Sequence, residues 1–153
     1  MGMLHNIQLA MSRHLVGDSW MAGIDVITQN EGDLDTMIRT TLSRLGIVAT
    51  ISMGKAGRPM QNTGLYFEEV VYVVEVQEYV AKNRGAQGTG KPVLDVCERI
   101  AWRLHNFEVA PGTTLYCVDP GIIPVTISPP ATAAYAVAFE TSDGVDPTPQ
   151  QEG

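Results

Sequence analysis

The sequence predicts an α+β domain, in which a mainly antiparallel β-sheet carries two principal packed α-helices and an N-terminal helix. Some segments repeat apolar residues at helical spacing, and others are β-branched or alternate apolar with polar residues. The chain of 153 residues is 44% hydrophobic, which is enough for one domain with its own core. Residues 1–142 are therefore expected to form a single α+β domain, and residues 143–153 a flexible acidic tail.

Amphipathic helices are predicted at residues 3–16, 33–45 and 92–107. Asp33 is a good N-cap for the second helix, and Gly46 supplies the left-handed residue that ends it. Pro92 suits the first position of the third helix. The expected buried stripes are Leu4, Ile7, Met11 and Leu15, then Leu34, Met37, Ile38, Leu42 and Leu45, then Val93, Val96, Cys97, Ile100, Leu104 and Phe107.

Strands are predicted at residues 24–28, 47–53, 65–80, 113–118, 122–128 and 131–141. The long segment 65–80 is expected to be a central strand, because its alternate residues Val70, Tyr72, Val74 and Val76 share one apolar face. The last three strands are expected to form a meander. The final strand alternates bulky residues with alanines, so one of its faces is smooth enough for close approach by another element.

Composition limits the partners. The formal net charge is −7, so the average field repels nucleic acid, and no basic helix indicates a groove reader. Basic residues are concentrated locally only in predicted loops, at Lys55 with Arg58 and at Lys82, Arg84 and Lys91.

The two cysteines, Cys97 and Cys117, are expected to be buried and free. The N-terminus lacks the apolar stretch of a signal peptide, and no run of about 18 apolar residues indicates a membrane span. The chain is therefore expected to fold in a reducing cytoplasm.

The segment Gly85–Pro92 nearly matches a nucleotide-binding loop. Such a loop needs Ser or Thr after its lysine to ligate magnesium, but Pro92 offers neither a hydroxyl nor an amide hydrogen. We therefore favour a structural or assembly loop, whose glycines give a flexible connection into the helix, and keep phosphate binding as the alternative.

Catalytic and metal-binding patterns are weak. His5 and His14 are nine residues apart, too far to chelate one metal, and Glu68 and Glu69 are strand neighbours that point to opposite faces. The sequence therefore predicts a protein that is not an enzyme and needs no metal or cofactor. Trp20 and Trp102 are expected in the core, with partner anchoring as the alternative.

The order of elements is distinctive. Residues 30–39 read Asn-Glu-Gly-Asp-Leu-Asp-Thr-Met-Ile-Arg, and residues 42–48 read Leu-Ser-Arg-Leu-Gly-Ile-Val. One long strand follows, then Gly-Thr-Gly-Lys-Pro at 88–92 and the helix Val-Leu-Asp-Val-Cys-Glu-Arg-Ile-Ala-Trp-Arg-Leu-His at 93–105. Over nearly its whole length, in order and spacing, the chain resembles the tail terminator (tail-completion) proteins of long-tailed bacteriophages and prophages.

The resemblance implies a noncatalytic virion protein that is assembled in the host cytoplasm. Its homo-oligomeric ring, usually a hexamer, would cap the finished tail tube, stop polymerisation and present the surface that docks to head–tail connector proteins. Lys55, Arg58, Lys82, Arg84 and Lys91 would then bind the tube protein or the connector, and DNA would pass through the lumen only transiently. The alternatives are a head–tail connector, a minor tail protein, or a nucleotide-binding protein that uses Gly85–Lys91.

Overall fold

The computed structural model describes residues 2–29, 31–55, 59–60, 66–67, 70–119 and 121–142, so the predicted tail and Arg58 lie outside the described residues. The helices are α1 (Met3–Val16), η1 (Ser19–Met21, a 3₁₀ turn), α2 (Leu34–Leu45), α3 (Val80–Asn83) and α4 (Val93–Leu104). The strands are β1 (Asp25–Thr28), β2 (Ile47–Lys55), β3 (Pro59–Met60), β4 (Tyr66–Phe67), β5 (Val71–Glu78), β6 (Glu108–Ala110), β7 (Thr113–Cys117), β8 (Ile123–Pro124) and β9 (Ala133–Thr141).

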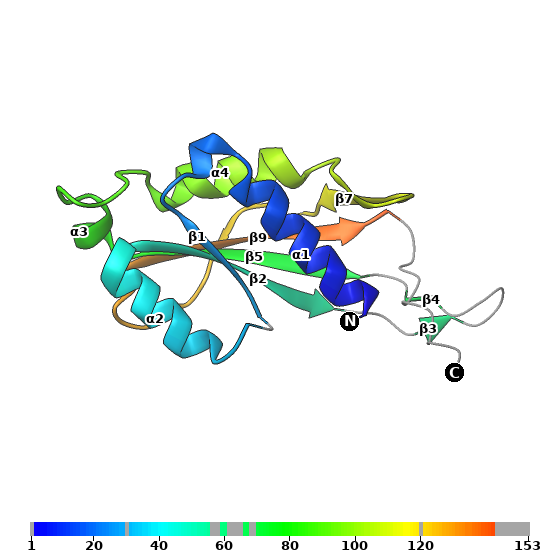
Figure 1. The fold of residues 1–153 in the computed structure, drawn as a ribbon, viewed down its shortest axis with the longest axis horizontal. Coiled ribbons are helices and arrows are strands. Elements are labelled where there is room, and N and C mark those ends of the chain that lie inside the picture. The colour runs from blue at the N-terminus through cyan, green and yellow to red at the C-terminus, as the bar shows by residue number, and fades with distance from the viewer. Residues whose placement is uncertain are drawn as a thin grey trace.

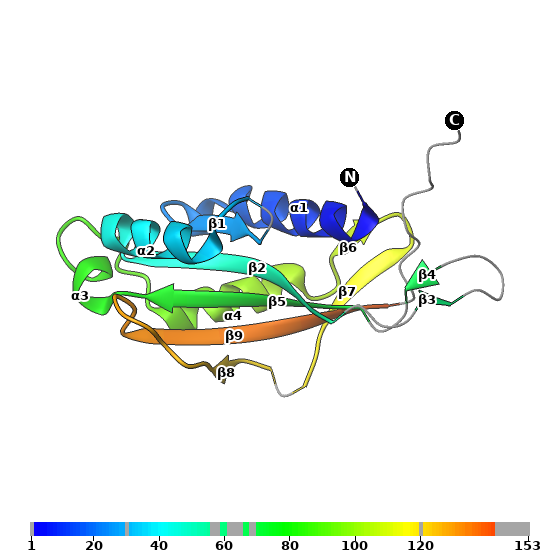
Figure 2. The same ribbon diagram turned by 90° about the horizontal axis from the view of Figure 1, so that it is seen from below.

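One seven-stranded sheet organises the molecule, with β3 and β4 forming a separate two-stranded sheet (Figures 1 and 2). The strand order is β1-β2-β5-β9-β7-β6, and β8 pairs with β9. Strand β1 runs parallel to β2, whereas the other neighbours are antiparallel. The α+β class is confirmed, and the mainly antiparallel sheet is mixed because of its parallel edge strand.

Helices cover both faces of the sheet. Helices α1 and α4 share a core cluster with β5, where Tyr72, Val74 and Val76 are fully buried as the alternation predicts. Helix α2 packs on the opposite face, where Leu42 meets Val48 of β2. Strand β2 is thus apolar on both faces, which explains why it reads as a nearly continuous apolar run.

The helix boundaries follow their local signals. Asp33 caps α2, accepting hydrogen bonds from the Thr36 hydroxyl at 2.8 Å and from its N–H at 3.4 Å. Gly46 ends α2 in the left-handed region with φ 84°. A Cβ on Gly46 would lie 2.4 Å from the Asn83 nitrogen, so this position also requires glycine for close approach.

The third helix is shorter than predicted at both ends. Pro92, the predicted first helical residue, is instead the N-cap with an extended backbone, and the helix begins one position later at Val93. The helix ends at Leu104 instead of residue 107, because His105 is extended and Asn106 has φ 67°. The chain then returns through β6, a strand that the sequence did not predict.

The predicted meander is wrong. Strands β7 and β8 do not pair with each other but lie end to end along the same edge of β9. The Val118 and Val125 N–H groups, one at each end of the connection, bond to the carbonyls of Ala138 and Ala134 of β9. Strand β8 is only two residues long, and Pro124 within it has no N–H for a ladder.

The long central strand is also shorter than predicted. Strand β5 begins at Val71, and the chain turns into the short helix α3 at Val80 instead of continuing extended. The bulky residues Val137 and Phe139 of β9 belong to the core cluster shared with α4, so the alanines that alternate with them lie on the other face of the strand.

Candidate functional site

The structure separates the predicted basic residues into two places. Lys82, Arg84 and Lys91 lie on α3 and the loop before α4, at one end of the elongated domain, whereas Lys55 ends β2 near the opposite end (Figure 1). The strand register explains the separation, because β2 spans the sheet from Ile47 opposite Glu78 to Lys55 opposite Val71. The predicted partner-binding residues therefore form two regions and not one site.

A carboxylate occupies the N-terminus of α4. Glu78, at the end of β5, is fully buried, and its Oε1 accepts a hydrogen bond from the Val93 N–H at 3.1 Å. Its Oε2 accepts from Asn83 Nδ2 at 2.7 Å and from Arg84 Nε at 3.0 Å. A helix N-terminus attracts anions through its free N–H groups and its dipole. The chain thus supplies its own anion where a bound phosphate would lie, which favours the structural interpretation of the loop.

The glycine loop folds back on Asn83. The Asn83 side chain donates to the Lys91 carbonyl at 2.8 Å and accepts from the Thr89 hydroxyl at 2.7 Å, and the Gly90 N–H bonds to the Asn83 carbonyl. A Cβ on Gly88 would lie 1.9 Å from the Asn83 oxygen. Gly88 therefore permits a close backbone contact, a role different from the flexible connection that the sequence suggested.

Lys91 is held within the chain. Its ammonium group donates to the Trp20 carbonyl and, at 3.4 Å, to the Ala22 carbonyl, and it lies 4.9 Å from the centre of the Trp20 ring. Arg99 contacts the same ring at 5.9 Å. Lys91 thus ties the loop to η1. The Arg84 side chain remains 47% exposed despite its ion pair with Glu78.

Asp18 joins η1 to α4 through a buried ion pair that the sequence did not reveal. Its side chain is 5% exposed, caps η1 at the Trp20 N–H, and accepts from Arg99 at 2.6 and 2.9 Å. Arg103 lies 3.7 Å away. The hydrogen bonds from Arg99 lower the pKa of Asp18 to about 2. No local signal could show this pair, because 81 residues separate its members.

The histidines lie in separate environments. The His14 ring stacks on Phe107 with centroids 3.8 Å apart, and burial lowers its pKa. His105 Nδ1 accepts from the Cys117 N–H at 3.0 Å. In the part of the chain that the structure describes, no three His, Cys, Asp or Glu side chains gather as a possible metal site.

The cysteines are free, as expected. Cys97 is fully buried on α4, and burial raises its pKa to about 12. Cys117 is only half-buried, so its predicted burial is wrong. None of the described helices is both long enough and apolar enough to cross a membrane.

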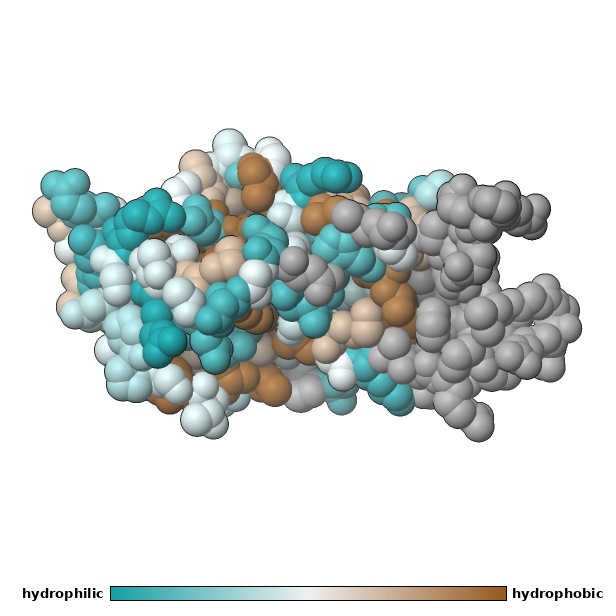
Figure 3. All heavy atoms as spheres, turned by 60° about the horizontal axis from the view of Figure 1, so that its bottom comes forward, coloured by the Kyte–Doolittle hydropathy of each residue, from teal (hydrophilic) through white to brown (hydrophobic). Residues whose placement is uncertain are grey.

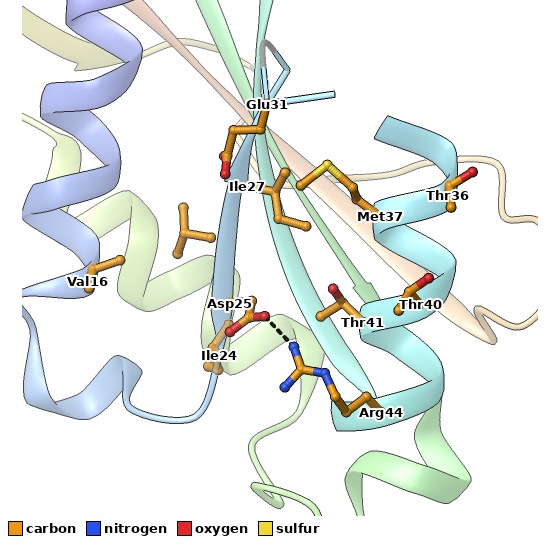
Figure 4. Close-up of a pocket in the computed structure, with 11 residues that line it drawn as sticks. Val16, Ile24, Asp25, Ile27, Glu31, Thr36, Met37, Thr40, Thr41 and Arg44 are labelled. Carbon is orange, nitrogen blue, oxygen red and sulfur yellow. Dashed lines mark hydrogen bonds and ion pairs between the residues drawn. The ribbon is translucent and has the colours of Figure 1, made fainter. Parts of the chain in front are cut away.

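A hollow of about 500 Å³ lies beside β1, between the end of α1 and helix α2 (Figure 4). Ile27 and Met37 give it an apolar floor, and the end of α1 contributes Val16, which is 63% exposed. Inside the hollow, Asp25 of β1 forms an ion pair of 2.8 Å with Arg44 of α2.

Large apolar side chains are also exposed elsewhere. Trp102 on α4 is 67% exposed, so its predicted core position is wrong, whereas Trp20 is half-buried against the core. Leu94, Ile123 and Ile127 are also exposed. On the face drawn in Figure 3, apolar residues form separate patches among polar ones.

Comparison of the chain with protein-family models gave no match, and comparison with curated proteins gave none either.

Proposed function

We propose that the chain is a noncatalytic bacteriophage tail terminator, which forms a ring that caps the tail tube, stops its polymerisation and provides the head-docking surface. The observation that carries the proposal is the Glu78 carboxylate at the N-terminus of α4. It occupies the position that a nucleotide phosphate would need and leaves the glycine loop a structural role. The order of elements that resembles the tail terminators supports the same function.

The two basic regions fit a ring that binds different partners on its two sides. The α3 region with Lys82 and Arg84 and the β2 end with Lys55 lie at opposite ends of the domain (Figure 1). One end would face the tube protein and the other the head–tail connector. Basic side chains at such faces steer association with acidic partner surfaces.

The exposed apolar residues suit contacts between subunits. Trp102 lies on α4, and Ile127 lies in the segment after β8, so two different surfaces carry large apolar groups. A cyclic ring requires heterologous contacts between two different patches of each subunit, each burying roughly 800 Å² per partner.

Tube polymerisation tests the proposal. Purified tail tube protein of the same phage or prophage would be polymerised with and without this protein, and tube lengths would be measured by electron microscopy. We expect shorter tubes that carry a ring at one end. Unchanged lengths with bare ends would refute the proposal. Immunogold labelling of virions separates a terminator, found at the head-proximal tube end, from a connector in the head or a minor tail protein elsewhere.

Calorimetric titration with ATP and magnesium tests the nucleotide-binding alternative. We expect no binding heat, because Glu78 fills the anion position and Lys91 bonds to backbone carbonyls. Binding to the wild type that is lost in Lys91→Ala would contradict the proposed function.

A further inference from the structure

Strand β1 has an outer edge that can accept another strand. The Gln29 N–H bonds to the Ile51 carbonyl of β2 at 3.0 Å. Because backbone groups alternate sides along a strand, the N–H and C=O of Val26 point away from β2. The Glu31 carboxylate accepts the neighbouring outward N–H, that of Thr28. Among the described residues, the edge left for a partner strand is therefore short and centred on Val26.

The hollow beside this edge combines an apolar floor, which can take an aliphatic side chain, with a polar wall of threonines and charged residues. Its volume of about 500 Å³ is several times that of an isoleucine side chain, and Ile27 and Met37 form its apolar floor. Val16 remains 63% exposed at its rim in the single chain. An apolar partner in the hollow would remove this surface from water.

The β8 segment has the complementary features. Residues 122–128 read Ile-Ile-Pro-Val-Thr-Ile-Ser and contain no charged residue. The Val125 N–H bonds to Ala134 of β9, so the Pro124 carbonyl points outward with no N–H beside it. Ile123 and Ile127 are 41% and 42% exposed. The segment therefore presents apolar side chains and an outward backbone acceptor.

We propose that the β1 edge and its hollow bind residues 122–128 of a second copy of this chain. Strands β1 and β8 lie on opposite sides of one sheet, so they cannot pair within a single chain (Figure 2). Thr126 and Ser128 of the same segment face α2 of their own chain across a second, polar hollow. The outward Val26 N–H would donate to the outward Pro124 carbonyl. The segment is uncharged and so brings no charge that would compete with the Asp25–Arg44 ion pair or meet the Glu31 carboxylate of the hollow.

The strand directions are consistent with a ring. Strand β1 runs parallel to β2, and three antiparallel steps through β5 and β9 make β8 run opposite to β1. Copies that keep their strand direction around a ring axis would therefore join β1 to β8 as antiparallel neighbours. Such a contact is heterologous and closes into a ring when the rotation permits. This inference rests on the proposed ring function and assigns its subunit interface.

Matched variants test the interface by size-exclusion chromatography with light scattering. Ile127→Asp places a charge on the β8 segment, and Thr40→Trp fills the hollow from an exposed position of α2. The controls are Leu94→Asp on the exposed side of α4 and Ser43→Trp on α2, neither of which lines the hollow. We expect Ile127→Asp and Thr40→Trp to reduce the assembly to monomers and both controls to retain it.

Mixing the two defective variants gives a sharper readout. Ile127→Asp keeps an intact hollow and Thr40→Trp keeps an intact β8 segment, so an equimolar mixture should form a one-to-one dimer and nothing larger. In a second measurement, Val16→Cys and Ile127→Cys chains should form a covalent mixed dimer on oxidation, beyond the level given by the wild type.

Several results would overturn the inference: a monomeric wild type, assemblies that survive both Ile127→Asp and Thr40→Trp, or a mixture that yields neither the dimer nor the cross-link. Assembly that is lost in Leu94→Asp and retained in Ile127→Asp would also overturn it, while leaving the ring function intact. A chain that assembles through the hollow but leaves tail tubes uncapped would refute the proposed function and support the proposed interface.

Discussion

Replacing Asp18 by Asn should remove a buried ion pair while leaving the local turn intact. Asp18 accepts two short hydrogen bonds from Arg99, which lies on α4 and is 34% exposed. Asparagine keeps a side-chain oxygen that can still accept the Trp20 N–H, so the cap of η1 survives. The substitution therefore isolates the contribution of the negative charge.

The magnitude follows from the pKa of Asp18, which is lowered from 3.8 to about 2, chiefly by hydrogen bonds from Arg99. One pKa unit corresponds to about 1.4 kcal/mol, so the ionised carboxylate contributes about 2 kcal/mol to the free energy of unfolding at neutral pH. Breaking a fully buried ion pair typically costs about 3 to 5 kcal/mol. The contribution of Asp18 is smaller because the Arg99 side chain is partly hydrated. Since the folded pKa is depressed, the contribution is complete above pH 3.8 and is lost as the pH falls through about 2.

Urea unfolding between pH 7 and the lowest pH with a cooperative transition checks this reasoning. Asp18→Asn should unfold with about 2 kcal/mol less free energy than the wild type at pH 7, and the difference should shrink below pH 4. Asp119→Asn, in the exposed turn after β7, is the matched control and should show no such loss. A stability equal to the wild type at pH 7, or a deficit that stays constant into acid, would refute the ion-pair account.

Three further outcomes are expected. Gly46→Ala should lower the free energy of unfolding by more than about 2 kcal/mol, because the new Cβ meets the Asn83 backbone and the residue must keep a positive φ. An unchanged denaturant midpoint would contradict this. Glu78→Ala should cost about 3 kcal/mol in the same assay and Glu78→Gln less, because glutamine retains an acceptor for the N-terminus of α4; equal losses would argue against the capping role. In the native protein a thiol reagent should modify Cys117 well before Cys97, because Cys97 is fully buried and its pKa is raised to about 12; equal rates would contradict the packing of α4.

Prediction of the elements succeeded where the signals are local. The apolar stripe and the Asp33 cap place α2, and Gly46 ends it, because helix termini depend on backbone groups within a few residues. The alternation around Tyr72 identifies the buried face of the central strand for the same reason. Prediction of the meander failed because β7 and β8 both pair with β9 and not with each other, although they are neighbours in sequence.

Prediction of the candidate site was weaker, since its contacts join distant segments. The missing hydroxyl at Pro92 predicts that the loop is structural, and this stays a prediction. Nothing local showed that Glu78 would lie at the N-terminus of α4. The basic residues were predicted from charge alone, and the structure places Lys55 far from Lys91, which is bound to the η1 backbone. Trp102 lay at the border of an apolar stripe, where spacing cannot distinguish core from surface.

The sequence by itself determined the α+β class, the three long helices and the buried face of the central strand, because periodicity and capping act between residues close in the chain. Only the tertiary structure decided which strands pair, which ions are buried, and that strands β1 and β8 lie on opposite sides of one sheet. Those features depend on contacts between residues far apart in sequence. The packing of the whole domain selects these contacts, so they leave no local pattern in the sequence.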